Sequence, residues 1–222
     1  MNTKIILDNY DIEIKNMIAS YENMIDCEVD VAYNAKSSQG ILDFTVTQAS
    51  LNAIGLKLDT QNNNLKALYT VSSKKDRLKI NKSNWNLQGN TINVDEMVLP
   101  INLSALEVIV PQTEIFSKEL AKMYISGHAD LDKMQVLLDV NVKDVYLETI
   151  KLKNDDNYIK IKYDESLLLT TKDRLDFQWN SEKSFINPIT LEMKNNQLLL
   201  SDTYLNIGNL LKTKISADYN FK

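Results

Sequence analysis

The sequence contains few of the residues on which enzyme active sites and metal centres are built. Its 222 residues include one cysteine, Cys27, and one histidine, His128. A single cysteine excludes an intrachain disulfide and a cysteine-based zinc cluster. The patterns G-x-x-x-x-G-K-[ST] and G-x-G-x-x-G are both absent, so nucleotide binding has no support. We therefore expect a protein that is not an enzyme and that uses no metal and no cofactor.

Long hydrophobic runs are missing too. No stretch approaches the about 20 apolar residues that a membrane-spanning helix needs. The first eight residues contain no apolar run long enough for a signal peptide. The last eight, Ile215 to Lys222, still alternate between apolar and polar residues where the sequence stops. These ends predict a single β-rich domain, residues 1–222, excised from a longer chain.

Neither sign of charge is concentrated anywhere along the chain. The 25 Lys and Arg residues are interspersed with 30 Asp and Glu residues, which gives a net charge of −5. A nucleic-acid-binding protein gathers its positive charge on one face or stripe. Nucleic acid is therefore not an expected partner.

The strongest pattern in the sequence is alternation with a period of two. Successive side chains of a β-strand point to opposite faces, so each such run has one apolar face and one polar face. Turn-forming Asn, Asp, Ser and Lys residues separate the runs. The pattern predicts a mainly β fold, a curled antiparallel meander with an apolar trough, and the alternative is a closed β-sandwich or solenoid. Clear runs are Cys27, Val29 and Val31; Phe44 and Val46; Val136, Leu138 and Val140; Ile159 and Ile161; Leu175 and Phe177; Ile189 and Leu191.

Two segments depart from this alternation and favour short helices. Thr113 can cap a helix in which Phe116, Leu120 and Met123 follow at helical spacing, and Gly127 can end it. We therefore predict an amphipathic helix over 113–125, and a second short helix around 16–24.

One or two short helices cannot cover the apolar faces of so many strands. A sheet does not leave such a face in water, because burial is worth about 25 cal/mol per Å². The sheet can close on itself, pack on a helix, or curl into a trough whose lining meets a ligand. The predicted lining comprises Val29, Val31, Phe44, Val46, Val136, Leu138, Val140, Ile159, Ile161, Leu175, Phe177, Ile189 and Leu191.

The polar clusters have simpler explanations than catalysis. His128, Asp130 and Asp132 would share one face of a strand, but without a second histidine a solvated strand face explains them better. Residues 154–157, Asn-Asp-Asp-Asn, lack the spacing of a calcium loop and read as a turn. Trp179 alternates with Phe177 and Leu175, which favours core packing over ligand stacking.

Short alternating strands joined by Asn, Asp and Lys turns also carry a family resemblance. Tyr158-Ile159-Lys160-Ile161-Lys162-Tyr163 is one such strand, and Leu198 to Ile207 contains another. The phrase Ile125-Ser126-Gly127-His128-Ala129-Asp130-Leu131 is similar to the G-x-A-x-L strand openings common in that family. The chain thus resembles a middle or C-terminal segment of the AsmA-like bacterial envelope proteins, of the TamB and YhdP type.

The resemblance implies a long curled sheet with an apolar trough that carries phospholipid between the two membranes of the envelope. It also implies a periplasmic location and an inner-membrane anchor, which would lie outside this chain. Phospholipid or another acyl-chain ligand, and envelope membrane proteins, would be the partners. The alternative function is a structural or protein-interaction β module without a ligand.

Overall fold

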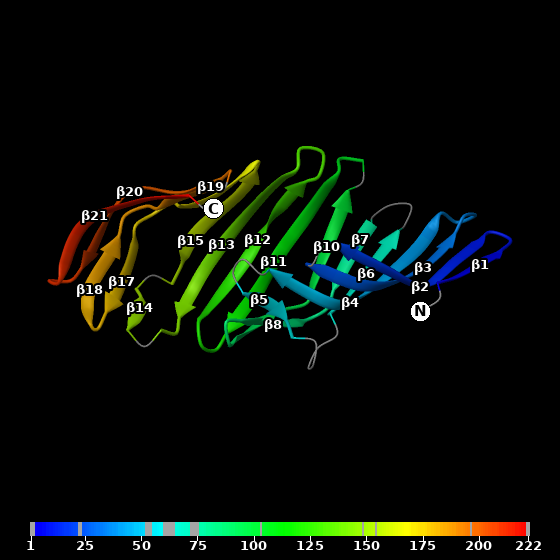
Figure 1. Ribbon diagram of the computed structural model, residues 1–222, viewed down its shortest axis with the longest axis horizontal. Coiled ribbons are helices and arrows are strands. Elements are labelled where there is room, and N and C mark those ends of the chain that lie inside the picture. Colours follow the sequence, from blue (N-terminus) through cyan, green and yellow to red (C-terminus); the bar gives the residue numbers. More distant parts are fainter. Residues whose placement is uncertain are drawn as a thin grey trace. The chain divides into compact units, whose positions relative to one another are not determined.

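The strands of this protein are built from the alternating runs, and antiparallel hairpins join them. The computed structural model describes residues 3–21, 24–51, 55–59, 65–71, 76–102, 104–147, 149–153, 155–195 and 197–220. Within these ranges there are 21 strands and no helix (Figure 1). The predicted fold class, a mainly β antiparallel meander, is confirmed. The contacts divide the chain into two compact units, Met1–Thr113 and Glu114–Lys222.

The first unit contains the strands β1 to β11, and β2, β3, β4 and β11 are the longest of them. In chain order they are β1 (Lys4–Asp8), β2 (Asp11–Tyr21), β3 (Ile25–Asn34), β4 (Gln39–Leu51), β5 (Leu56–Leu58), β6 (Leu65–Val71), β7 (Asp76–Ile80), β8 (Ser83–Leu87), β9 (Asn90–Val94), β10 (Met97–Asn102) and β11 (Glu107–Ser117), of which residues 114–117 belong to the second unit.

The strands of the second unit follow the same succession of long and short elements. They are β12 (Ala121–Asp130), β13 (Gln135–Val145), β14 (Ile150–Leu152), β15 (Asn157–Asp164), β16 (Ser166–Thr171), β17 (Leu175–Trp179), β18 (Glu182–Ile186), β19 (Thr190–Lys194), β20 (Gln197–Ile207) and β21 (Leu211–Asn220).

Strand pairing follows the same plan twice. In the first unit β4 pairs with β6, β6 with β7, and β7 with β10, while β5, β8 and β9 form a second group, in which β5 also pairs with β4. In the second unit β13 pairs with β15, β15 with β16, and β16 with β19, while β14, β17 and β18 form the equivalent group. Each plan ends in a hairpin, β10–β11 and β19–β20 respectively. The fold therefore contains a structural repeat of eight strands.

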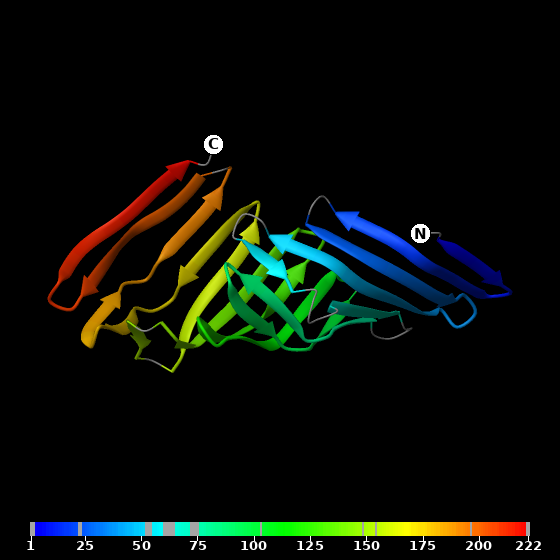
Figure 2. The ribbon, with the colours of Figure 1, turned by 60° about the horizontal axis from the view of Figure 1, so that its bottom comes forward.

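Register shifts recur at equivalent places and strengthen this relation. The β2–β3 ladder is interrupted between Ile14 and Met17, and the β20–β21 ladder between Leu200 and Thr203. A second pair of shifts lies in the β3–β4 and β12–β13 ladders. Because a bulge bends its strand and increases the local twist, each repeat bends its long strands at the same point. Figure 2 shows these long strands, with β20 beside β21 and β2 beside β3.

The helix predicted over 113–125 is wrong. Residues 113–117 complete β11, residues 118–120 form a turn, and residues 121–125 begin β12. The alternation of β11 was hidden because Thr113 and Ser117, only 3% and 4% exposed, occupy buried positions where an apolar residue would be expected. Gly127, the expected helix end, lies inside β12 opposite Leu138.

The second predicted helix, around 16–24, is also a strand where the structure describes it. Strand β2 runs to Tyr21, Met24 lies in a turn, and residues 22 and 23 lie outside the described residues. Asn16 lies in the bulge of β2 with a positive φ of 57°. Its backbone N–H donates a hydrogen bond to Asp30 Oδ1 at 2.8 Å. This extra residue disturbs the period of two and produces the helix-like spacing.

Candidate functional site: an apolar sheet face in each unit

Apolar side chains in the second unit form continuous rows across the strands. Residues that pair across an antiparallel ladder lie on the same face of the sheet, so the register identifies the members of each row. One row crosses seven strands and contains Gly127, Leu138, Ile161, Leu169, Leu191, Leu200 and Ala217. The next row contains Val136, Tyr163, Leu167, Met193, Leu198 and Tyr219. We call this surface the apolar face of the second unit.

The first unit carries an equivalent surface. Its strands β2, β3, β4, β6, β7 and β10 align two rows of apolar residues, which we call the apolar face of the first unit. One row contains Met17, Val29, Phe44, Ala67, Ile80 and Met97, and the other contains Ile14, Val31, Leu42, Tyr69, Leu78 and Leu99.

Ten of the thirteen residues predicted to line a trough fall on these two faces. Val29, Val31 and Phe44 lie in the rows of the first unit, and Val46 lies beside them opposite Cys27 and Leu65. Val136, Leu138, Val140, Ile159, Ile161 and Leu191 lie on the apolar face of the second unit.

The remaining three predicted residues lie outside the rows, in β17 and in the segment between β18 and β19. Leu175 pairs with Ile186, which pairs with Leu205 of β20, and Phe177 pairs with Leu152 and Ser184. Ile189 lies between β18 and β19, where its N–H donates to Thr171 Oγ1 at 2.9 Å.

Sequence reasoning missed more than half of each row. Leu167-Leu168-Leu169 and Leu198-Leu199-Leu200 are unbroken leucine runs in which no alternation is visible. Their register shows that Leu168 and Leu199 both pair with Glu192 and point to the polar face. The charges on neighbouring strands, such as Lys162 opposite Leu168, were the one signal that could have separated the two sets.

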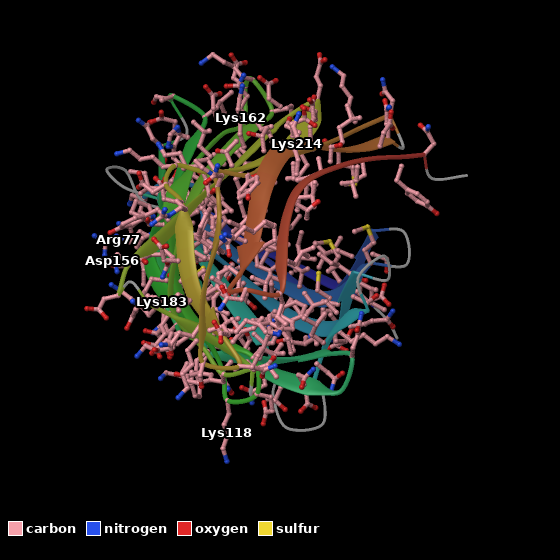
Figure 3. All side chains as sticks on the ribbon, turned by 90° about the vertical axis from the view of Figure 1, so that its left-hand side faces the viewer. Arg77, Lys118, Asp156, Lys162, Lys183 and Lys214 are labelled. Atoms are coloured by element: carbon pink, nitrogen blue, oxygen red, sulfur yellow. The ribbon has the colours of Figure 1, made fainter. Side chains whose placement is uncertain are left out.

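The opposite face of the sheet is charged. Lys162 Nζ lies 3.0 Å from Asp164 and Lys160 Nζ lies 4.0 Å from Asp139. Figure 3 shows the labelled Lys162 of β15 on the outer side of the ribbon of the second unit. Since Ile161 is adjacent to Lys162 in a regular strand, its side chain points to the inner side. The apolar face of the second unit therefore lies on the concave side of its own sheet.

Exposure varies across the apolar face of the second unit. Val140 is only 7% exposed, whereas Tyr163, Met193 and Tyr219 are 48%, 42% and 59% exposed. The row that contains the last three follows the hairpin ends of its strands. One margin of the face is thus open to solvent, and the side chains become more buried toward Val140.

The surface area of the molecule shows that its apolar faces are incompletely covered. A chain of 25.4 kDa that forms two compact halves would expose about 12,500 Å². The protein exposes 14,749 Å², and among the described residues only five hydrophobic side chains are less than a tenth exposed. A sheet of one layer explains both values, because neighbouring strands cover the edges of each strand but no second layer covers its side chains.

A separate cavity of about 580 Å³ lies at one end of the first unit. Its lining includes Asp8, Asp11 and Glu13, together with Asn34 and Thr70. Asn34 Nδ2 donates to Asp11 Oδ1 at 2.6 Å, and Lys15 pairs with Glu13 at 3.1 Å. None of the thirteen predicted lining residues borders this cavity.

The polar clusters weighed from the sequence are engaged in surface interactions. Asp130 accepts hydrogen bonds from the Lys133 side chain and backbone at 2.6 and 3.0 Å, and these bonds lower its pKa. Asp156 is bound by Lys143 and by Asn141, while Asn154 lies outside the described residues. Across the described ranges, no three His, Cys, Asp or Glu side chains converge as metal ligands.

Cys27 lies on the apolar face of the first unit, between Ala19 and Val46. Its thiol is in contact with the Ala19 carbonyl at 3.6 Å, and desolvation by burial raises the pKa of the thiol. A thiol in this position behaves as a small apolar residue.

No family model, curated protein or solved structure matches this chain. Among the residues that the structure describes, there is no helix long and apolar enough to span a membrane.

Proposed function

We propose that this chain is a lipid-binding segment whose apolar sheet faces shield acyl chains from water. The observation that carries the proposal is the set of unbroken apolar rows, which cross six or seven strands in each unit and remain partly open to solvent. An acyl chain costs about 0.8 kcal/mol per CH₂ to expose to water. A continuous apolar row offers cover along its whole length.

The transport role is part of the same proposal. The resemblance to AsmA-like envelope proteins suggests movement of phospholipid between two membranes across the periplasm. Rows without specific polar contacts suit such a role, because a lipid tail meets similar side chains at each position and is not held at one of them. No catalytic group is needed for this mechanism.

The test compares two substitutions at adjacent positions of β13. Leu138→Asp places a charge in the apolar row, whereas Leu137→Asp places it on the opposite face, beside Lys162 and His128. We expect protein purified from a bacterial host to carry phospholipid in native mass spectrometry. Leu138→Asp should lose most of that lipid from the second unit, and Leu137→Asp should keep it. Circular dichroism checks that both variants stay folded.

Cys27 provides a second readout that needs no substitution. Lipid bound to the apolar face of the first unit should slow alkylation of this thiol, compared with delipidated protein at the same pH. Failure of added phospholipid to bind, together with an unchanged alkylation rate, would reject the lipid proposal. It would leave a structural or protein-interaction module, which the exposed edge strand β1 favours.

A further inference from the structure

The strand β1 forms an edge of the first unit. Within the described residues it pairs with β2 and continues no ladder on its other side (Figures 1 and 2). Its side chains are open to solvent, with Ile5 64% and Leu7 73% exposed. Edge strands of natural proteins are usually protected from pairing by charges, prolines or bulges within the strand. The Ile5-Ile6-Leu7 centre of β1 has none of these.

Equivalent strands elsewhere in the molecule are paired on both sides. β10 and β19 occupy the place of β1 in the two repeats, since each forms a hairpin with the long strand that follows it. Their outer sides are covered by β7 and β16 respectively. The position of β1 is therefore one at which this fold accepts a further strand.

The turn that follows β1 determines which backbone groups face outward. Asn9 and Tyr10 form a two-residue turn, so Asp8 and Asp11 are the closing pair and share the turn hydrogen bond. Hydrogen-bonded and non-hydrogen-bonded pairs alternate along an antiparallel ladder. The N–H and C=O groups of Ile5 and Leu7 therefore point away from β2 and are available to another strand.

Charges at the ends of β1 indicate which strand it accepts. Within the β1–β2 hairpin, Lys4 lies opposite Lys15 and Asp8 lies opposite Asp11. Like charges that face each other directly are destabilising. Lys15 is also paired with Glu13, and Asp11 accepts a hydrogen bond from Asn34. Lys4 and Asp8 nevertheless each face a residue of like charge, and an opposite charge on the free side of β1 would stabilise both.

We propose that β1 pairs antiparallel with β1 of a second copy of this chain, about a two-fold axis through Ile6. In that register Ile5 faces Leu7 of the second copy, and these are the residues whose backbone groups point outward. Lys4 faces Asp8 of the second copy at each end. Ile5 and Leu7 share a face with Ile14 and Ile12, so the apolar faces of the two first units lie on the same side.

The other edge strand, β21, is less suited to pairing. Lys212, Lys214 and Asp218 alternate along its polar side, and Lys214 already contacts Asp202. Lysines on an edge strand are a usual barrier to pairing with another chain. Self-association is therefore assigned to β1.

Charge reversal at the two ends of β1 tests this interface. Lys4→Asp and Asp8→Lys each place like charges together in the dimer, although each places opposite charges together within the hairpin, facing Lys15 and Asp11. We expect the delipidated 222-residue chain to show a monomer–dimer equilibrium in analytical ultracentrifugation. Each single variant should weaken the dimer by about tenfold or more.

An equimolar mixture of the two variants supplies the specific check. In the mixed pair, the aspartate introduced by Lys4→Asp faces the lysine introduced by Asp8→Lys at one end, and natural Asp8 faces natural Lys4 at the other. Opposite charges therefore meet at both ends, and a heterodimer should form with an affinity near that of the natural chain. Leu138→Asp, which lies far from β1 in sequence and in the second unit, should leave dimerisation unchanged. Monomers at all concentrations would overturn the proposal. So would charge variants that associate like the natural chain, or association that only Leu138→Asp removes. Because lipid is absent throughout, these outcomes are independent of the proposed function.

Discussion

Gly127 shows how closely two strands of the second unit approach each other. A Cβ atom added there would lie 2.0 Å from the Leu137 carbonyl oxygen and 2.9 Å from the Leu138 Cα. Both are backbone atoms, so relief requires the ladder to shift. We expect Gly127→Ala to lower the free energy of unfolding by about 3 kcal/mol, measured by urea denaturation. Ala129→Gly, two residues further along the strand, should cost only about 1 kcal/mol. Equal stability of Gly127→Ala and the natural chain would contradict the close approach.

The pair formed by Lys122 and Glu114 gives a pH dependence. Lys122 Nζ lies 3.0 Å from Glu114 Oε2, which also accepts a hydrogen bond from Tyr124 Oη at 2.8 Å. The hydrogen bond to Glu114 raises the pKa of Lys122 from 10.5 to about 12. A raised pKa means that this contribution to stability is fully present below pH 10.5 and is lost as the pH rises through about 12.

Glu114→Gln should therefore return the pKa of Lys122 toward 10.5, measured by NMR titration of the lysine side chain. Glu119→Gln is the matched control, because Glu119 interacts with Ser117 and not with Lys122. A pKa that stays near 12 in Glu114→Gln would show that Glu114 is not the cause.

At the scale of the element, the sequence predicted strands well where apolar residues carry the alternation. Strands such as β13 and β15 have apolar residues at every second position, so their class and their inner face were both readable. β11 was misread because small hydroxyl residues take its buried positions. Thr113 Oγ1 donates to the Pro111 carbonyl at 3.1 Å, a bond that lets a polar side chain be buried.

Pairing between elements could not be read from the sequence. The two repeats pair their strands in the same order, yet their bulges contain different residues, Lys15-Asn16 in one and Ser201-Asp202 in the other. A bulge requires an extra residue and not a particular side chain. The apolar rows depend on this register, so the sequence could predict single members such as Leu138 but not the continuous surface they form.

For the whole molecule, the exposed apolar area has a thermodynamic consequence. The protein exposes 14,749 Å², about 2,300 Å² more than two compact halves of the same total mass would expose. The heat capacity of unfolding rises by about 0.45 cal/mol/K for each Å² of apolar surface that unfolding exposes. Surface that is already open in the folded state does not contribute.

We therefore expect the heat capacity of unfolding to lie below the about 3 kcal/mol/K usual for a chain of 222 residues, by at most about 1 kcal/mol/K, the limit reached if the whole excess is apolar. Calorimetry on delipidated protein, at concentrations where sedimentation shows monomers, measures it. Addition of phospholipid should raise the value, because bound acyl chains cover the rows that unfolding then exposes. A delipidated monomer with the full value would mean that protein already covers both faces. In that case the lipid proposal would lose its physical basis, whatever lipid accompanied the protein through purification.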